Sequence, residues 1–174
     1  WRGILTELEN MKSGRWQTTI GKNLKGKTLG IFGLGKQGLQ VANFGKAFGM
    51  NVIAWSHNLI KDDCENVNIE YVDCLDLFKK SDILTIHTRL SKRTHGFIDS
   101  AKLNLMKKDS FLVNTSRGPI IKESDLVNCL QNKIIGGAAL DVFDIEPLPN
   151  DHYLRSINNL ILTPHIGYVS TESY

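Results

Sequence analysis

Three glycines at fixed spacing, Gly33, Gly35 and Gly38, form a G-x-G-x-x-G pattern that is suited to binding a chain of phosphates. The pattern follows the apolar run TLGIF and opens a segment of helical character, which is the context that makes it informative. We expect Gly33 to allow a tight turn, Gly35 to let the backbone approach a pyrophosphate, and Gly38 to let the helix pack closely on a sheet. The free amides at the start of that helix, and the positive end of its dipole, would face the phosphates. The spacing therefore predicts a dinucleotide-binding loop.

The residue at the end of the next apolar run bears on which dinucleotide is bound. An Asp or Glu about 20 residues after the glycine pattern usually binds the adenosine ribose, but the segment NVIAWSHNL places Ser56 there. Without an acid, the charge that disfavours a 2′-phosphate is missing. No arginine lies near Ser56 in the sequence either, where only His57 and Lys61 are basic. We expect NAD as the cofactor and leave NADP open.

These residues need a framework, and after Lys27 the sequence alternates apolar runs with helical patterns. The runs are mostly continuous in apolar character, as in strands covered on both faces; they are TLGIFG, NVIAW, DILTIH, FLVNT, IIGGAALDV and NLILTPH. Helices are expected at residues 36–48, 73–80, 100–107 and 122–131. This alternation predicts an α/β fold, a Rossmann-type doubly wound parallel sheet with helices on both faces.

Polar residues follow each expected strand. In an open parallel sheet, ligands bind outside the carboxyl ends of the strands, so these residues are expected to gather at one edge. After the glycine loop, they are Ser56, His87, Thr88, Thr115, Ser116, Arg117, Asp141, Glu146 and His165.

The first 23 residues differ from the rest of the chain. Ile4, Leu5, Leu8 and Met11 follow helical spacing, and a polar, glycine-containing stretch comes after them. We expect residues 1–23 to form an interdomain helix and connector that docks on material outside this chain. Residues 24–174 are expected to form the nucleotide-binding domain.

The bulk composition is that of an ordinary globular domain and excludes several classes of protein. Of the 174 residues, 41% are hydrophobic and 22% are charged, and the net charge of +3 is too mild to predict binding of nucleic acid. No apolar run approaches the ~20 residues that a membrane helix needs, and the charged start lacks a secretory pattern. Because Cys64, Cys74 and Cys129 are odd in number and widely spaced, we expect neither disulfides nor a metal site, and a reducing cytoplasm as the location.

Three further segments carry a resemblance to a known family. NTSRGPII, GAALDVFDIEPLP and LTPHIGY follow GLGKQG in the same order as in the D-isomer-specific 2-hydroxyacid dehydrogenases, which this chain resembles from about Leu24 onward. That family includes phosphoglycerate, glycerate and D-lactate dehydrogenases. The resemblance covers the nucleotide-binding domain only, so it implies that the family's substrate domain is absent from this chain. It also implies an NAD(P)-dependent oxidoreductase that acts on a small 2-hydroxy or 2-keto acid, and a homodimer formed through this domain.

The resemblance assigns catalytic roles to three residues: Arg117 would bind the substrate carboxylate, His165 would act as acid and base, and Glu146 would pair with His165. Their chemistry suits these roles. An arginine is always charged and presents a planar fork, and a histidine exchanges protons near neutral pH. A carboxylate beside a histidine favours the imidazolium and fixes its tautomer. We expect Gly118 and Pro119 to set the backbone that aims Arg117.

The resemblance also implies a set of residues that contact the cofactor. They are Gly33, Gly35, Lys36, Gln37, Gly38, Ser56, Thr88, Thr115, Ser116, Arg117, Asp141, His165 and Gly167.

Two other classes of function stay open. An NAD(H)-sensing regulator of the corepressor type would keep the same residues, and a turnover assay separates it from an enzyme. A methyltransferase also has a glycine loop after its first strand, but it does not need the ordered arginine, glutamate and histidine segments. Binding of NADH rather than S-adenosylmethionine separates that class. The sequence does not indicate which 2-hydroxy acid would be the substrate.

Overall fold

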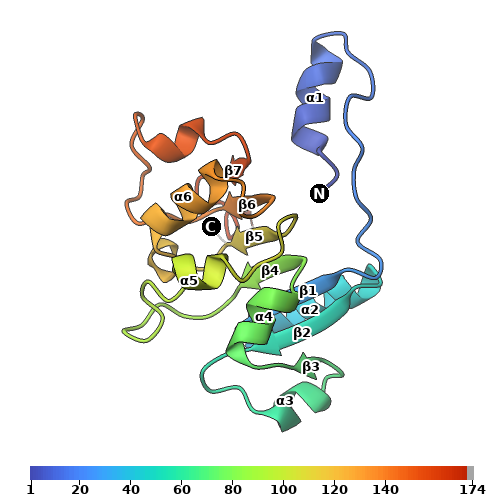
Figure 1. Cartoon of the computed structure of the whole chain (residues 1–174), viewed down its shortest axis with the longest axis vertical. Helices are drawn as coiled ribbons and strands as arrows, with labels where there is room; N and C mark the ends of the chain where they lie inside the picture. Colours follow the sequence, from blue (N-terminus) through green and yellow to red (C-terminus); the bar gives the residue numbers. More distant parts are fainter. Residues whose placement is uncertain (172–174) are drawn as a thin grey trace.

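The computed structural model of the chain describes residues 1–171. Seven strands form one parallel sheet in the order β3-β2-β1-β4-β5-β6-β7 (Figure 1). The strands are β1 (Thr28–Phe32), β2 (Asn51–Trp55), β3 (Glu70–Tyr71), β4 (Ile83–Ile86), β5 (Phe111–Asn114), β6 (Gly137–Leu140) and β7 (Leu160–Leu162). The strand order reverses direction at β1, as in a doubly wound fold. The prediction of a doubly wound parallel sheet is confirmed.

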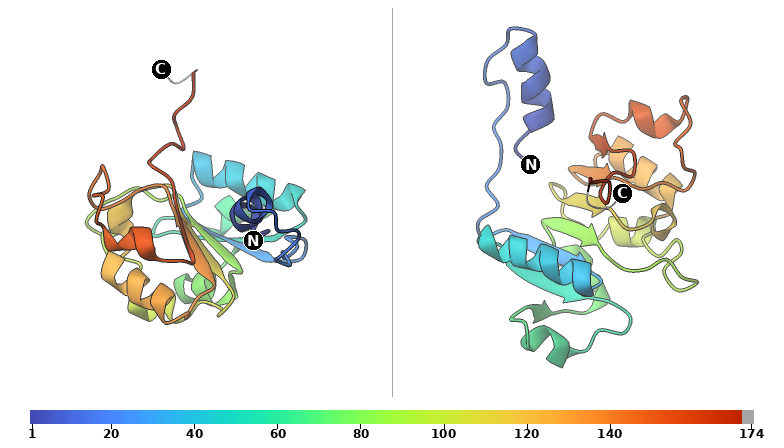
Figure 2. Two further views of the ribbon diagram at one scale, coloured as in Figure 1. Left: turned by 90° about the horizontal axis from the view of Figure 1, so that it is seen from above. Right: turned by 180° about the vertical axis from the view of Figure 1, so that it is seen from behind.

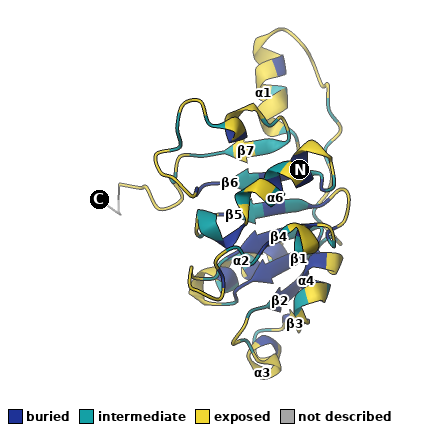
Figure 3. Cartoon of the chain, turned by 60° about the vertical axis from the view of Figure 1, so that its left-hand side comes forward, coloured by how far each residue is buried: buried dark blue, intermediate teal, exposed yellow. Residues whose placement is uncertain are grey.

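Helices cover both faces of this sheet, as predicted. The helices are α1 (Ile4–Lys12), α2 (Lys36–Ala47), α3 (Lys61–Glu65), α4 (Cys74–Lys80), α5 (Ser100–Leu103) and α6 (Glu123–Gln131). α2 lies on one face, whereas α4, α5 and α6 lie on the other (Figures 1 and 2). Each face has its own apolar core. Ile31 and Ala42 are buried in the core beside α2, and Phe32 and Leu126 in the other. The central strands are accordingly buried (Figure 3).

Two elements at the edge of the sheet were not predicted, and one helix is shorter than expected. The two residues of β3 pair with Ile53 and Ala54 of β2. A strand this short shows no hydrophobic period, and both of its residues are exposed. The short α3 precedes it. The helix expected at residues 100–107 ends as α5 at Leu103, and turns follow up to the start of β5.

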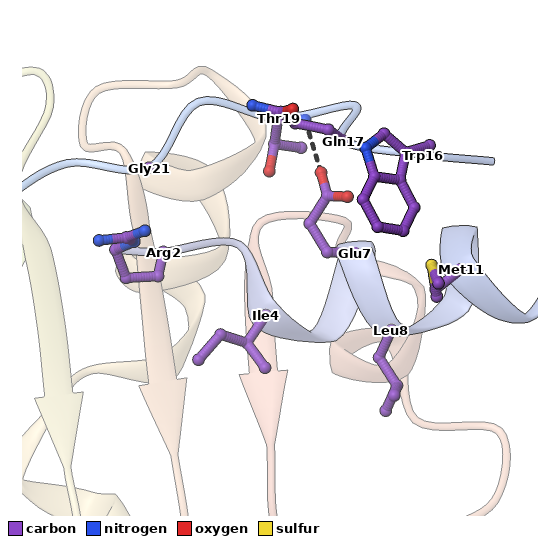
Figure 4. Close-up of a pocket in the computed structure, with 9 residues that line it drawn as sticks. All are labelled: Arg2, Ile4, Glu7, Leu8, Met11, Trp16, Gln17, Thr19 and Gly21. Carbon is purple, nitrogen blue, oxygen red and sulfur yellow. Dashed lines mark hydrogen bonds between the residues drawn. The ribbon is translucent and has the colours of Figure 1, made fainter.

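The amino-terminal segment stands apart from the sheet as an arm (Figures 1 and 2). Its base is fixed where the Trp1 ring packs on Phe111, with centroids 5.6 Å apart, and where Lys22 pairs with Asp109 at 2.9 Å. Glu7 on α1 accepts hydrogen bonds from Thr18 and Thr19, which folds the connector back along the helix (Figure 4).

The apolar stripe that was predicted on α1 is exposed in this chain. Ile4 is 71% exposed and Met11 57%, and Trp16 on the connector is 76% exposed. These side chains line a groove along the arm with Arg2, Glu7, Leu8, Gln17, Thr19 and Gly21 (Figure 4). Docking of this stripe on material outside the chain, and the division at residues 23 and 24, stay predictions. No helix within residues 1–171 has both the length and the apolar character needed to cross a bilayer.

Candidate functional site

The glycine loop after β1 has the geometry that a bound pyrophosphate requires. Gly33 has a φ of 104°, and a Cβ there would lie 2.7 Å from the Thr88 nitrogen, so no side chain fits. Gly35 is the N-cap of α2, and a Cβ there would have no atom within 4 Å. The backbone at Gly35 therefore borders open space. The first amides of α2 point toward it without intrahelical partners, and Lys36 and Gln37 begin the helix there.

Gly38 fixes how closely α2 lies on the sheet. A Cβ at Gly38 would lie 2.1 Å from the Gly33 carbonyl oxygen, and one at Gly45 would lie 2.5 Å from Leu29 Cδ2. Ala42 lies between them on the same buried face of α2. The small side chains thus hold the start of α2 directly above the loop. The structural roles predicted for Gly33 and Gly38 are confirmed, whereas contact with a cofactor stays a prediction.

The loop after β5 is held by a buried asparagine that sequence reasoning missed. The Asn114 side-chain amide donates to the Arg117 carbonyl at 2.9 Å, and its oxygen accepts from the Ser116 amide at 3.0 Å. The Ser116 hydroxyl donates to the Thr88 carbonyl at 2.5 Å. These bonds join the ends of β4 and β5 and bring Thr88, Thr115 and Ser116 to the edge that carries the glycine loop. An asparagine at the end of an apolar run, followed by a turn, is the signal that could have found this residue.

Arg117 lies exposed at the end of this loop, with Nη1 donating to the Ser116 carbonyl at 2.6 Å. The position after Arg117, Gly118, has room only for glycine. A Cβ at Gly118 would lie 2.2 Å from the Phe143 carbonyl carbon, so two backbones cross in contact here. Pro119 lies in the short 3₁₀ turn η1 (Gly118–Ile120) that follows. The close approach at Gly118 is thus a structural fact, and the aiming of Arg117 by Gly118 and Pro119 stays a prediction.

Glu146 and His165 form the predicted pair. His165 Nδ1 lies 2.6 Å from Glu146 Oε2, while Glu146 Oε1 accepts from the Phe143 amide at 2.8 Å. Burial acts to raise the pKa of Glu146, but the hydrogen bonds from His165 and Phe143, and the charges of His165 and Arg117, bring that pKa below its usual value. Glu146 is therefore ionised at neutral pH. An ionised carboxylate only accepts hydrogen bonds, so Nδ1 of His165 is the donor.

Asp141 shapes the backbone that carries His165. Its Oδ1 accepts from the Thr163 hydroxyl at 2.5 Å and from the Ile166 amide at 3.0 Å, and its Oδ2 accepts from the Gly167 amide at 2.9 Å. His165 between them has a φ of 53°, an uncommon conformation for a residue with a side chain. The buried carboxylate thus stabilises a strained turn that presents the imidazole. The sequence placed Asp141 among the cofactor contacts; the structure gives its carboxylate this positioning role, and a cofactor contact stays a prediction.

A cavity of about 700 Å³ opens beside the pair. The Tyr168 and His165 rings pack edge to face, with centroids 5.3 Å apart. Arg155 also lines the cavity, but its guanidinium donates to the Leu148 and Pro149 carbonyls at 2.8 Å each. The lining consists of Phe143, Glu146, Pro147, Leu148, Arg155, Leu162, Thr163, Pro164, His165, Tyr168 and Val169. The cavity thus has apolar and polar walls and room for a small molecule beside the histidine.

The end of β2 has an arginine nearby that the sequence did not lead us to expect. Ser56 follows Trp55, which stacks on Phe97 with centroids 5.6 Å apart. Next to it, the Arg93 guanidinium donates to Asn58 Oδ1 at 3.3 Å. The sequence showed no arginine near Ser56, and the fold supplies one from the loop after β4. Within residues 1–171, no group of three or more His, Cys, Asp or Glu side chains lies together in a way that could hold a metal ion.

Comparison with known proteins places this chain in a family. Residues 1–167 match the family that is described as "D-isomer specific 2-hydroxyacid dehydrogenase, NAD binding domain". A glyoxylate reductase from Aeropyrum pernix is 43% identical over 154 residues, which are 88% of this chain and 46% of that protein. The chain spans about half the length of the curated relatives it matches.

Solved structures give the same result. The phosphoglycerate oxidoreductase from Vibrio cholerae O395 superposes with a TM-score of 0.93 at 36% identity, over 99% of this chain and 57% of that one. A Rhizobium etli protein solved in complex with NADP, HEPES and L(+)-tartaric acid superposes with a TM-score of 0.85 at 31% identity, over 98% of this chain and 55% of that one. The predicted resemblance is confirmed: the chain belongs to the D-isomer specific 2-hydroxyacid dehydrogenases and corresponds to their NAD-binding domain.

Proposed function

We propose that the protein containing this chain transfers a hydride between a nicotinamide dinucleotide and a D-2-hydroxy acid or its 2-keto acid. The observation that carries the proposal is the 2.6 Å contact between His165 Nδ1 and Glu146 Oε2, beside a cavity. Because the chain spans about half the length of its relatives, we propose that the substrate lies between this domain and a second one. This chain by itself is then expected to bind the dinucleotide but to turn over poorly.

In this proposal His165 manages one proton through Nε2. Its Nδ1 donates to Glu146, so Nε2 is the ring nitrogen left to face a substrate oxygen. In reduction, the imidazolium gives the Nε2 proton to the oxygen of the keto acid; in oxidation, the neutral ring accepts the proton of the hydroxyl. Glu146 is a positioning residue: its negative charge stabilises the imidazolium and its hydrogen bond holds the ring.

Arg117 would bind the carboxylate of the acid. Its guanidinium lies exposed at the mouth of β5 and is close enough to Glu146 to contribute to lowering the pKa of that carboxyl. A fork of two charge-assisted hydrogen bonds fixes a carboxylate in both position and orientation. The carboxylate and the reacting oxygen of a 2-hydroxy acid are on adjacent carbons, so a clamp at Arg117 would orient the oxygen toward His165.

The chain's own residues fit a dinucleotide. The positive φ of Gly33, the open space at Gly35 and the close approach of Gly38 to Gly33 form a cradle for a pyrophosphate. Lys36, Gln37, Ser56, Thr88, Thr115 and Ser116 would contact other parts of the cofactor. The bound nicotinamide supplies the hydride chemistry, whereas the protein binds, orients and moves the proton.

The test is a steady-state assay of the complete protein. Oxidation of NADH and NADPH is followed with glyoxylate, hydroxypyruvate, pyruvate or phosphohydroxypyruvate as the acceptor. We expect turnover with at least one acid, its near-complete loss in His165→Ala, and normal rates in His95→Ala, which removes an exposed histidine outside the site. Near-normal rates in His165→Ala would overturn the proton assignment. Nucleotide binding without turnover on any acid would favour an NAD(H)-sensing binding module instead.

We propose further that the protein is a homodimer formed through this domain and lies in the cytoplasm. The exposed stripe of Ile4, Leu8 and Met11 on the projecting arm supports an interface. The three free cysteines support a reducing compartment. Light scattering after size exclusion tests the dimer: Leu8→Asp should shift the mass toward the monomer, and an unchanged mass would place the interface elsewhere.

A further inference from the structure

Arg93 brings a guanidinium to the end of β2, although it lies far away in the sequence. Its Nη1 donates to Asn58 Oδ1 at 3.3 Å, across 35 positions of the chain. β2 and β4 are the two neighbours of β1 in the sheet, so the loops that follow them flank the glycine loop. A dinucleotide on that loop presents its adenosine ribose at the end of β2. Arg93 therefore lies on the ribose side of the site.

The residue next to Arg93, Thr94, holds the loop that carries Arg93 by hydrogen bonds. Thr94 is buried, and its hydroxyl donates to the Arg89 carbonyl at 2.7 Å and accepts from the Ser91 amide at 2.8 Å. These bonds fix the backbone on either side of Arg93. The Arg93 side chain itself is exposed, so a ligand can reach its guanidinium.

The surroundings of this guanidinium favour an anion. Ser56 stands where an acid would bind the ribose hydroxyls, and no ion pair within residues 1–171 joins Arg93 to a carboxylate. Burial, and then the Arg93 charge, lower the pKa of His57, so these two side chains are close enough to interact. The His57 ring packs against the Trp55 and Phe97 rings, with centroids 4.9 Å away in each case. A fixed aromatic wall thus borders the arginine.

We propose that Arg93, aligned by Asn58, binds the 2′-phosphate of NADP(H) and makes this protein select NADP(H) over NAD(H). The inference rests on the proposed function, and it departs from the NAD that the sequence led us to expect. A guanidinium fork forms two charge-assisted hydrogen bonds with a phosphate, which the uncharged 2′-hydroxyl of NAD cannot match. Arg93 is a specificity-determining residue and takes no part in proton transfer.

The test compares two nucleotides that differ only in the 2′-phosphate. Adenosine 2′,5′-bisphosphate and 5′-AMP are titrated into the complete protein by calorimetry at fixed ionic strength, so the readout does not depend on catalysis. The wild type should bind the bisphosphate about 10-fold more tightly or better, since hydrogen bonds between charged groups are the strong ones. Arg93→Gln should abolish most of this preference and leave the affinity for 5′-AMP unchanged, which also shows that the variant is folded.

Lys92→Gln is the matched control, because it removes the adjacent cation of the same loop. It should keep the preference for the bisphosphate. Two results overturn the inference. One is a wild type that binds the bisphosphate and 5′-AMP with nearly equal affinity. The other is an equal loss of the preference in the Lys92 and Arg93 variants, since non-specific electrostatic attraction by the loop would then explain it. If 5′-AMP binds and the two affinities are nearly equal, only the role of Arg93 is wrong. If neither nucleotide binds, the proposed dinucleotide site itself is wrong.

Discussion

The glycine loop allows a test that separates the binding of a cofactor from the stability of the fold, by adding one methyl group at either of two glycines. Gly35 has a φ of −85°, which alanine adopts readily, and a Cβ there meets no atom within 4 Å. Gly38 lies three residues later, and its Cβ would lie 2.1 Å from the Gly33 carbonyl oxygen. Gly35→Ala should therefore spare the fold and obstruct the pyrophosphate, whereas Gly38→Ala should damage the fold itself.

The expected magnitudes follow from these environments. In Gly35→Ala, the weaker N-cap and the reduced entropy of the unfolded chain oppose each other, each by about 0.5–1 kcal/mol, so stability stays within about 1 kcal/mol of wild type. In Gly38→Ala, the clash of the added methyl group with the Gly33 carbonyl oxygen costs about 3 kcal/mol, the upper end for overpacking, and better helix propensity returns about 1 kcal/mol. The net loss of about 2 kcal/mol should lower Tm by about 4–8 °C in a domain of this size.

The assay pairs thermal unfolding with titration of NADH and NADPH, followed by the fluorescence of the reduced nicotinamide. If the methyl group of Gly35→Ala removes one hydrogen bond to a charged phosphate, about 1.5–3 kcal/mol is lost and Kd rises about 10- to 150-fold. Unchanged dinucleotide affinity in Gly35→Ala would refute the placement of the pyrophosphate over this loop. An unchanged Tm in Gly38→Ala would refute the close packing of α2 on Gly33.

The remaining predictions concern the residues around the substrate and the ribose. Arg117→Lys keeps the charge and loses the fork, so kcat/KM of the complete protein should fall about 10- to 150-fold with little change in dinucleotide affinity; equal losses in both would place Arg117 in the cofactor site. Ser56→Asp should add an acceptor for the ribose hydroxyls and repel a 2′-phosphate, so the ratio of NAD to NADP efficiency should rise; an unchanged ratio would mean that the adenosine lies elsewhere. Glu146→Gln keeps the shape of the side chain and removes the charge beside the His165 ring, so kcat/KM for keto-acid reduction should fall with little change in dinucleotide affinity, and an unchanged kcat/KM contradicts the pairing. Burial acts to raise the pKa of Asp141, but the hydrogen bonds it accepts outweigh burial and hold that pKa below its usual value. The ionised form of Asp141 therefore stabilises the fold at pH values above the unfolded-state pKa of about 3.9. This stabilisation is lost as the pH falls through the lower folded-state pKa. Asp141→Asn should therefore unfold more easily than wild type at pH 7, and the difference in Tm should shrink as the pH falls below about 4, whereas a constant difference would argue against an ionised Asp141.

The sequence by itself determined the features that depend on local pattern. The apolar runs and the helical spacing predicted six of the seven strands described within residues 1–171, and their alternation with helices predicted a doubly wound fold. The glycine spacing predicted the loop, because the positive φ of Gly33 and the close approach at Gly38 admit no side chain. The segments around Arg117, Glu146 and His165 were informative together, because they follow the glycine loop in the same order as in the family that the chain resembles. Parallel strands then bring their ends to one edge whatever their separation along the chain.

Only the tertiary structure decided how groups from different loops meet. No periodic pattern in the sequence predicts three of these meetings. They are the crossing of the Gly118 and Phe143 backbones, the three hydrogen bonds that Asp141 accepts, and the contact of Arg93 with Asn58. β3 was missed for a related reason, since its two residues form a strand only through pairing with β2. Secondary structure follows from side-chain spacing within one segment, whereas these contacts follow from the distance between segments that the sheet order brings together. For that reason the sequence near Ser56 shows no arginine, while the folded chain places one there.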